Sequence, residues 1–206
     1  MITAEENVDL CAVGRGTLMG DFFRQFWTPV CLSSELKADG DPMRLMILGE
    51  KLVAFRDTEG RVGVFDHRCP HRCASLFFGR NELGGIRCAY HGWKFDVEGK
   101  CLDQPNLEDK SKYPAGTPAY AYKVRESGGL VFAYFGERQD NPPELPEIDA
   151  IMGEGDDRNI ALTHRDCNYM QALEGDVDTS HLGFLHMGGI DGEKLDLDDP
   201  EVFTVT

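Results

Sequence analysis

Two short cysteine–histidine pairs constrain this chain more than any other feature of its sequence. One residue separates Cys69 from His71, two separate Cys88 from His91, and sixteen lie between the two pairs. Each pair supplies one thiolate and one imidazole, which are side chains that bind transition metals. Seven cysteines in a chain without a recognisable secretory signal favour metal binding over disulfides. We therefore expect a metal centre at these four residues.

The ligand types favour a cluster of two irons. A [2Fe–2S] centre of mixed ligation needs two cysteines on one iron and two histidines on the other, and two loops that each carry both types can supply them. Tetrahedral zinc held by two cysteines and two histidines is the main alternative, and four unrelated buried side chains are a third. Zinc fingers group cysteine with cysteine and histidine with histidine, whereas each loop here mixes the two types.

The overall composition is that of a globular protein. Hydrophobic residues make up 41% and charged residues 28% of the 206 residues, enough for one sizeable core or two modest ones. No apolar run approaches membrane-spanning length, and the first six residues are acidic where a signal peptide needs basic ones, so we expect a cytoplasmic protein with no membrane partner. The net charge of −15 argues against nucleic acid as a partner.

The charge is spread unevenly along the chain. Residues 61–100 contain seven basic and four acidic residues, a difference of +3, whereas residues 140–206 contain three basic and seventeen acidic ones, a difference of −14. The basic stretch includes both cysteine–histidine pairs. It is either ordinary surface charge or a basic rim suited to an acidic electron-transfer partner.

Apolar residues recur every three or four positions in segment 14–27. This spacing predicts a short amphipathic helix with Thr17 as a possible N-cap. The apolar residues are Leu18, Met19, Phe22, Phe23 and Phe26.

A different pattern follows from Leu45 to about Tyr134. Short runs rich in Val, Phe, Ile and Tyr alternate with turn sequences, which is typical of strands joined by hairpins. The turn sequences occupy residues 57–60, 97–100 and 127–129. We predict a small antiparallel β domain here.

Segment 139–149 combines three prolines with acidic residues and has no apolar periodicity, so we place a domain boundary there. Beyond it, Asn168 with Gln171 three positions later predicts the capped start of a helix.

The sequence around the cysteine–histidine pairs resembles a known family, the Rieske oxygenases. Residues 69–96, CPHRCASLFFGRNELGGIRCAYHGWKFD, match the C-x-H … C-x2-H motif of that family and its surrounding glycines. The resemblance includes residues 26–36 and 52–71, covers most of the chain, and points to the phthalate dioxygenase-like branch. It implies a Rieske [2Fe–2S] cluster with four ligands, namely Cys69, His71, Cys88 and His91.

The motif departs from that of the respiratory Rieske proteins in two places. Those proteins carry an extra disulfide between the cluster loops, but Tyr90 stands where the second loop's extra cysteine would be, so we expect Cys73 to be a free, small apolar residue. Trp93 replaces a hydroxyl residue that donates a hydrogen bond to the cluster in high-potential proteins. Fewer such bonds imply a lower potential, which suits an oxygenase.

A second candidate metal site lies in residues 168–186. Non-haem iron oxygenases hold Fe(II) with two histidines and one carboxylate. The resemblance implies that the segment D-x2-H-x4-H supplies both histidines, His181 and His186, and that Asp178 links this iron to a Rieske histidine of a neighbouring subunit. Two hydrogen-bonded histidines without a metal are the alternative.

Helix geometry sets a condition on this second site. Asp178 and His181 are three residues apart and share a helical face, but His181 and His186 are separated by roughly 140° around a regular helix. Both reach one iron only if the helix distorts or ends between them. Gly183 is the residue expected to permit that change.

No third iron ligand is assigned. In the family the carboxylate and most of the catalytic domain come from a longer segment than this chain contains, so the resemblance implies a truncated product or a fragment. Several acids are available but none lies in a recognisable ligand motif; they are Asp191, Glu193, Asp196, Asp198, Asp199 and Glu201.

The sequence thus predicts an α+β chain in three parts. These are a helical segment at residues 1–25, an antiparallel all-β Rieske domain at 26–139, and at 140–206 a linker with the beginning of a helix-grip-like catalytic domain. By resemblance, electrons from NAD(P)H pass through a flavin or ferredoxin-type reductase to the cluster and then to mononuclear Fe(II), which activates dioxygen to hydroxylate or demethylate a small aromatic substrate. A homotrimer is implied, and the alternative function is that of a Rieske-type electron carrier without oxygenase chemistry.

Overall fold

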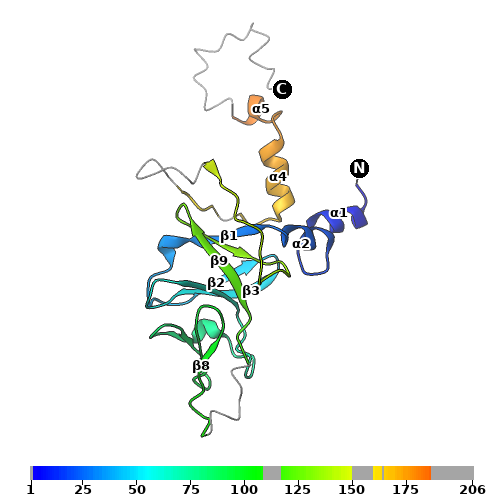
Figure 1. The fold of residues 1–206 in the computed structure, drawn as a ribbon. Helices are drawn as coiled ribbons and strands as arrows, with labels where there is room; N and C mark the ends of the chain where they lie inside the picture. The colour runs from blue at the N-terminus through cyan, green and yellow to red at the C-terminus, as the bar shows by residue number, and fades with distance from the viewer. Residues whose placement is uncertain (1, 109–116, 150–159, 164, 187–206) are drawn as a thin grey trace. The chain divides into compact units, whose positions relative to one another are not determined.

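A computed structural model describes residues 2–108, 117–149, 160–163 and 165–186 (Figure 1). The chain divides into two compact units. One contains Ala12–Leu162, and the other combines Met1–Cys11 with Thr163–Thr206. None of the helices in the described ranges is long and apolar enough to cross a membrane.

The larger unit is built on a six-stranded antiparallel sheet with the order β1-β10-β9-β4-β3-β2. Its strands are β1 (Trp27–Leu32), β2 (Met43–Ile47), β3 (Glu50–Arg56), β4 (Val62–Asp66), β9 (Ala121–Ser127) and β10 (Leu130–Tyr134). Strands β3, β4 and β10 are nearly continuous buried runs, since both of their faces are covered.

A smaller antiparallel sheet with the order β5-β6-β7-β8 forms the lower part of this unit in Figure 1. Its strands are β5 (Arg80–Asn81), β6 (Ile86–Arg87), β7 (Lys94–Phe95) and β8 (Cys101–Asp103). The 3-10 helix η2 (Leu76–Phe78) precedes it. One buried cluster joins the two sheets, with Phe55 and Phe65 from the large sheet against Ile86 and Phe95 from the small one. That cluster also contains Cys69 and Cys88, so the core itself holds the candidate ligands in place.

The predicted antiparallel β domain is confirmed, and the three turn sequences join β3 to β4, β7 to β8 and β9 to β10. Strand β1 was not predicted. It pairs with β10, about a hundred residues away, and its register shifts between Pro29 and Cys31. A proline in an edge strand at an irregularity weakens the local strand pattern, which is why this strand could not be predicted from its own residues.

The helix predicted over residues 14–27 is shorter than expected. Helix α2 spans Leu18–Phe23, and Thr17 is its N-cap as predicted, because the Thr17 hydroxyl accepts a hydrogen bond from the Gly20 N–H at 3.2 Å. The C-terminal part of the prediction was wrong: Trp27 is the first residue of β1, and its indole N–H donates to the Pro143 carbonyl at 2.8 Å. Strand pairing and burial of the indole outweigh helical periodicity there. The short 3-10 helix η1 (Ser33–Glu35) follows β1.

The second unit contains α1 (Ala4–Cys11), α4 (Tyr169–Val177) and α5 (Leu182–Leu185). Asn168 is the N-cap of α4 as predicted, since its side chain accepts from the Gln171 N–H at 3.1 Å. The Tyr169 hydroxyl donates to the Leu10 carbonyl and so joins α4 to α1.

Candidate metal centre

The two cysteine–histidine loops adopt the same turn. They are called here the first loop (residues 69–74), which follows β4, and the second loop (residues 88–93), which joins β6 to β7. In each loop the cysteine N–H donates to the carbonyl five residues later, at 2.8 Å in both cases. The N–H four residues after the cysteine donates back to the cysteine carbonyl, at 2.8 Å in the first loop and 3.0 Å in the second. The resulting pair of turns presents one thiol and one imidazole from each side.

The two thiols form a buried pair. Cys69 and Cys88 are both buried and belong to the same core cluster. Burial raises the pKa of the Cys69 thiol to about 12, with a further contribution from Cys88, while the backbone N–H groups of His71 and Arg72 point at the sulfur and oppose the shift. A metal that binds both cysteines must displace their thiol protons. The N–H groups of His71 and Arg72 would then stabilise the Cys69 thiolate.

The two imidazoles form a second pair. The ring centroids of His71 and His91 are 4.7 Å apart. Nδ1 of His91 is buried and has no hydrogen-bond partner among the described residues. Burial lowers the pKa of His71, helped by the positive charges of His91 and Arg72, so its neutral, metal-binding form is favoured. A buried ring nitrogen without a partner is costly unless it binds a metal, so these residues fit a mixed-ligand cluster.

Among the described residues, no three His, Cys, Asp or Glu side chains form a group that could hold a metal ion. The four candidate ligands of the two loops instead form two pairs, and a two-iron cluster needs one pair of protein ligands at each iron.

Arg87 braces the second loop, a role that the sequence did not reveal. Its guanidinium donates to the Gly92 carbonyl at 2.6 Å and pairs with Glu82 at 2.8 Å and Asp103 at 3.0 Å. Asn106 adds a hydrogen bond from its side chain to the His91 carbonyl at 3.3 Å. The only sequence signal is an arginine directly before a ligand cysteine, and its partners come from other elements.

Trp93 and Cys73 complete the surroundings of the cluster site. The indole of Trp93 is buried and lies flat on the His71 ring, with centroids 4.6 Å apart and an angle of 2°. From the sequence, Trp93 was interpreted only as the residue that replaces a hydroxyl donor. In the structure its indole supports the His71 imidazole. Cys73 is a free thiol as predicted, and it is exposed.

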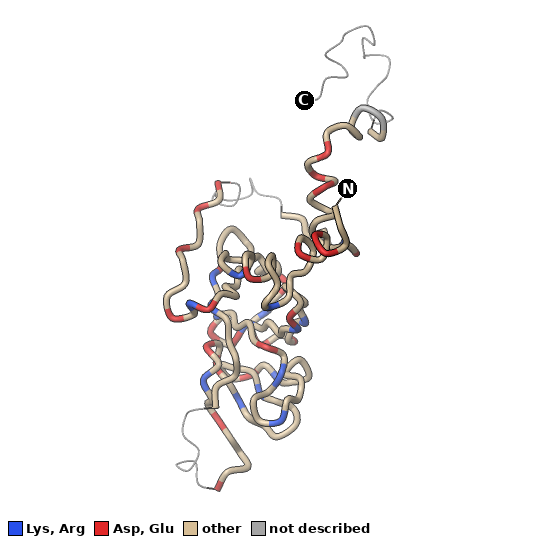
Figure 2. Tube along the Cα trace, turned by 90° about the vertical axis from the view of Figure 1, so that its right-hand side faces the viewer, with Lys and Arg blue, Asp and Glu red and all other residues tan. Residues whose placement is uncertain are grey.

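The basic stretch is less positive than its composition suggests. Four of its seven basic residues form ion pairs with nearby acids, three of which, Asp57, Glu59 and Asp103, lie outside the stretch. Figure 2 shows acidic residues interspersed with the basic ones along the larger unit. The paired residues are Arg61, Arg68, Arg80 and Arg87. A basic rim made by the whole stretch is therefore not what the structure shows.

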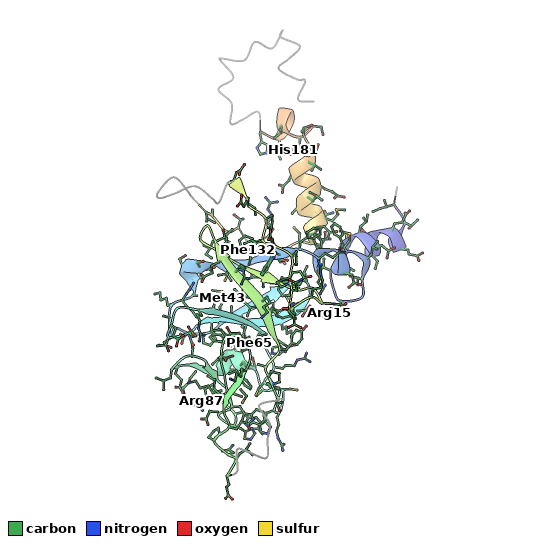
Figure 3. The ribbon with its side chains drawn as sticks, in the orientation of Figure 1. Arg15, Met43, Phe65, Arg87, Phe132 and His181 are labelled. Carbon is green, nitrogen blue, oxygen red and sulfur yellow. The ribbon has the colours of Figure 1, made fainter. Side chains whose placement is uncertain are left out.

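The second unit brings the other three predicted site residues together. His181 precedes α5 and His186 follows it, and their ring centroids are 5.4 Å apart. Nδ1 of His181 lies 3.2 Å from Oδ2 of Asp178. Figure 3 labels His181 beyond the end of α4. The imidazoles are therefore neighbours although five residues separate them.

The predicted place of the helix break was wrong. The helix ends at Val177, before His181, and Gly183 lies inside α5. Asp178 and His181 consequently share no helix face. The cause is the Asp178 carboxylate, whose Oδ1 accepts from the Ser180 N–H at 2.9 Å and from its hydroxyl at 2.6 Å, and which thereby stabilises a turn at the end of α4.

These contacts define the electrostatics of the second site. Hydrogen bonds from Ser180, and then the proximity of His181, hold the pKa of Asp178 below its usual value, so the carboxylate is charged at neutral pH. With Nδ1 of His181 facing this carboxylate, Nε2 is the nitrogen left for a metal. The acids considered as a third ligand, between residues 191 and 201, lie outside the described residues.

Comparison with known proteins identifies the family of this domain. The Rieske [2Fe-2S] domain family matches residues 26–118. The chain is 46% identical over 204 residues to the 3-chlorobenzoate-3,4-dioxygenase oxygenase subunit of Comamonas testosteroni, which covers 99% of this chain and 47% of that protein. It is also 46% identical over 187 residues to the phthalate 4,5-dioxygenase oxygenase subunit of Pseudomonas putida, covering 90% of this chain and 42% of that one.

A solved structure shows the same fold. Dicamba monooxygenase bound to 3,6-dichlorosalicylic acid superimposes with a TM-score of 0.66 at 27% identity, over 79% of this chain and 47% of that one. The chain spans about half the length of the relatives that it matches.

Fold and site together define a Rieske-type iron–sulfur protein. The chain belongs to the Rieske non-haem iron oxygenases, in their phthalate dioxygenase-like branch.

Proposed function

We propose that this chain acts in the oxygenase component of a Rieske oxygenase, with its cluster held by Cys69, His71, Cys88 and His91. The observation that carries the proposal is the buried thiol pair opposite an imidazole pair whose His91 Nδ1 has no partner among the described residues. When bound, the cluster supplies single electrons and a mononuclear Fe(II) supplies the activation of dioxygen for hydroxylation or demethylation of an aromatic compound.

The protein's own contribution at the cluster is to fix two unlike pairs of ligands. Cys69 and Cys88 would hold one iron, and the N–H groups of His71 and Arg72 would stabilise the Cys69 thiolate. His71 and His91 would hold the other iron, and Trp93, stacked on His71, keeps the orientation of that ring. Because an imidazole carries no charge where a thiolate would, this ligation raises the potential relative to an all-cysteine cluster.

Asp178 is proposed to connect the two metal sites. Its Oδ2 lies 3.2 Å from Nδ1 of His181, which leaves Nε2 of that imidazole free; His181 would hold Fe(II) through Nε2, and His186 would supply the second imidazole. The family resemblance places a cluster histidine of a neighbouring subunit, corresponding to His91, on the other side of this carboxylate. This connection requires an assembly, for which we propose the homotrimer.

The partners follow from the proposed role. Relatives are named as oxygenase subunits of a dioxygenase, which supports a separate electron donor, here a flavin or ferredoxin-type reductase that uses NAD(P)H. The relatives' names include chlorobenzoate and phthalate, which supports a small aromatic substrate for this chain.

The arrangement of the second site argues against a simple electron carrier. A carrier needs only the residues up to about 139. It has no use for a His181 side chain that pairs with Asp178 and lies beside the ring of His186.

The cluster is tested by metal analysis. Protein purified anaerobically should be brown, with about two irons and two sulfides per chain and the EPR spectrum of mixed cysteine and histidine ligation. Cys88→Ser should abolish this spectrum, whereas Cys101→Ser, at a partly buried cysteine outside the motif, should leave it unchanged. A colourless protein with one zinc per chain contradicts the proposal.

The connection between the sites is tested with Asp178→Asn. The variant should retain the cluster and Fe(II) binding, because neither requires this carboxylate as a ligand. Reoxidation of the reduced cluster by dioxygen with Fe(II) present should slow markedly, since an amide alters the hydrogen bond to His181. Unchanged reoxidation removes the connecting role, and loss of the cluster spectrum assigns Asp178 a structural one.

A further inference from the structure

Two hollows adjoin each other beside the cysteine side of the cluster site. The larger, of about 810 Å³, has Cys69 and Pro70 of the first loop in its wall. The smaller, of about 480 Å³, has Ser75 and Phe78 in its wall. Lys51 and His67 line both hollows, so the two adjoin at these side chains and are together called the depression here; neither cluster histidine lines either of them.

The charge of this depression is opposite to that of the chain. Four basic and two acidic residues line it, a surplus of +2 in a chain of net charge −15; they are Arg15, Arg44, Lys51 and Arg68 against Glu50 and Asp66. Both acids are already paired, Glu50 with Arg15 at 3.0 Å and Asp66 with Arg68 at 2.8 Å. Arg44 and Lys51 form no ion pair with any other described residue. The uncompensated positive charge therefore belongs to these two side chains.

Exposed apolar side chains accompany the two charges. Phe78 is 65% exposed, Met46 60% and Tyr120 52%, and all three line the depression. The Arg44 guanidinium lies over Phe77 at 3.9 Å and is thereby held at the surface. Arginine, methionine and aromatic residues are the types enriched in protein interfaces, and a small ion would need none of the apolar ones.

We propose that this depression, the Lys51 surface (Arg44, Met46, Lys51, Phe78 and Tyr120), is where the electron-donating protein docks, with acidic side chains of the donor facing Arg44 and Lys51. The inference rests on the proposed function. One electron passes from the reduced donor to the oxidised cluster, and no bond is made or broken. Because Cys69 lies in the wall, a docked donor would come next to one of the proposed cysteine ligands of the cluster. His71 and His91 line neither hollow, so a donor docked there would leave them available for the proposed connection through Asp178.

The test compares two double variants of equal charge change. Arg44→Glu with Lys51→Glu reverses the Lys51 surface. The control is Arg125→Glu with Lys123→Glu, on β9 of the same sheet: both side chains are exposed, and Arg125 lies over the Trp27 ring at 6.0 Å as Arg44 lies over Phe77. The probe is a reduced, strongly acidic plant-type [2Fe–2S] ferredoxin, and stopped-flow absorbance gives the rate of cluster reduction at low and high salt.

The variant with Arg44→Glu and Lys51→Glu should be reduced by the ferredoxin about tenfold or more slowly than the original protein at low salt, and its rate should lose most of its salt dependence. The reduction rate of the control variant should stay within about twofold of that of the original protein. Dithionite should reduce the cluster to the same extent in all three proteins, which separates docking from cluster integrity. Equal slowing in both double variants, or none in either, overturns the docking site and leaves the proposed function intact. A starting protein without a Rieske cluster overturns the proposed function itself.

A second copy of this chain is the competing occupant, because residues 140–206 are themselves acidic. Sedimentation of the same three proteins decides this. If Arg44→Glu with Lys51→Glu changes the oligomeric state but not the rate of reduction by ferredoxin, the depression is a contact between copies of the chain and the proposal is overturned.

Discussion

The two cluster loops share one turn but are held in it by different means. The residue four positions after the cysteine has a positive φ in both, +56° at Cys73 and +73° at Gly92. In the second loop this residue is glycine and its carbonyl is bound by Arg87, whose side chain is only 18% exposed. In the first loop it is a cysteine, and Arg68, the arginine directly before Cys69, is 59% exposed and pairs with Asp66.

This difference shows that one geometry can be stabilised locally or by distant elements. The first loop relies on its own backbone hydrogen bonds and on the isolated antiparallel β-bridge between the backbones of Arg68 and Ser75. The second depends on Arg87, which connects it to Glu82 and to Asp103 of β8. We therefore expect the second loop to be the more sensitive of the two to substitution.

The largest effect is expected from Arg87→Ala. It removes hydrogen bonds between charged groups and one to the Gly92 carbonyl, and should lower the free energy of unfolding by about 2–3 kcal/mol. Urea unfolding followed by cluster absorbance measures this. Arg68→Ala, the matched change at the first loop, should leave the midpoint nearly unchanged because that pair is at the surface. An equal loss of unfolding free energy in Arg87→Ala and Arg68→Ala would mean that both arginines stabilise their loops to the same extent.

Gly92→Ala should come next, at about 2 kcal/mol. A left-handed conformation costs a residue with a Cβ about 1–2 kcal/mol. The new Cβ would also lie 2.7 Å from Cγ of Pro105 and force a shift there. Cys73→Ala is the control, since Cys73 already has a Cβ at the corresponding position. A thermal midpoint for Gly92→Ala as high as that of Cys73→Ala would contradict this account.

Cys73→Gly should have a smaller effect of opposite sign. Glycine relieves the strain at a φ of +56° but adds freedom to the unfolded chain, which leaves a gain of about 0.5 kcal/mol. The thermal midpoint should rise slightly while the cluster spectrum stays the same. A lower midpoint would show that the Cys73 side chain makes a stabilising contact after all.

The smallest effect concerns pH. Hydrogen bonds from Arg87 and then Arg80 lower the pKa of Glu82, so its contribution to stability is complete above its unfolded value of 4.5 and is lost as the pH falls through the lower folded value. The cost of Arg87→Ala should therefore shrink between pH 7 and pH 4. The difference in urea midpoint between the two proteins at each pH tests this, and a constant difference would exclude Glu82 from the brace.

Much of the chemistry was predictable from short spacings. The pairing of Cys69 with His71 and of Cys88 with His91 is encoded within single loops, and so are the N-caps Thr17 and Asn168, because each depends on residues only a few positions apart. The hairpin turns belong to the same class. Strand β1 and the stacking of Trp93 on His71 were not predictable, since each requires a partner from a distant part of the chain.

The sequence by itself determined which residues could bind metal and that a β domain would carry them. The tertiary structure decided that the two thiols are buried together, that Nδ1 of His91 is left without a partner among the described residues, and that Arg87 supports one loop only. It also decided that α4 ends before Asp178, whose carboxylate accepts a hydrogen bond from the Ser180 N–H, and that Gly183 lies inside α5 and not at a break. The physical reason is that ligand type is a property of single side chains, whereas burial, pKa and hydrogen-bond partners depend on what the fold packs around them.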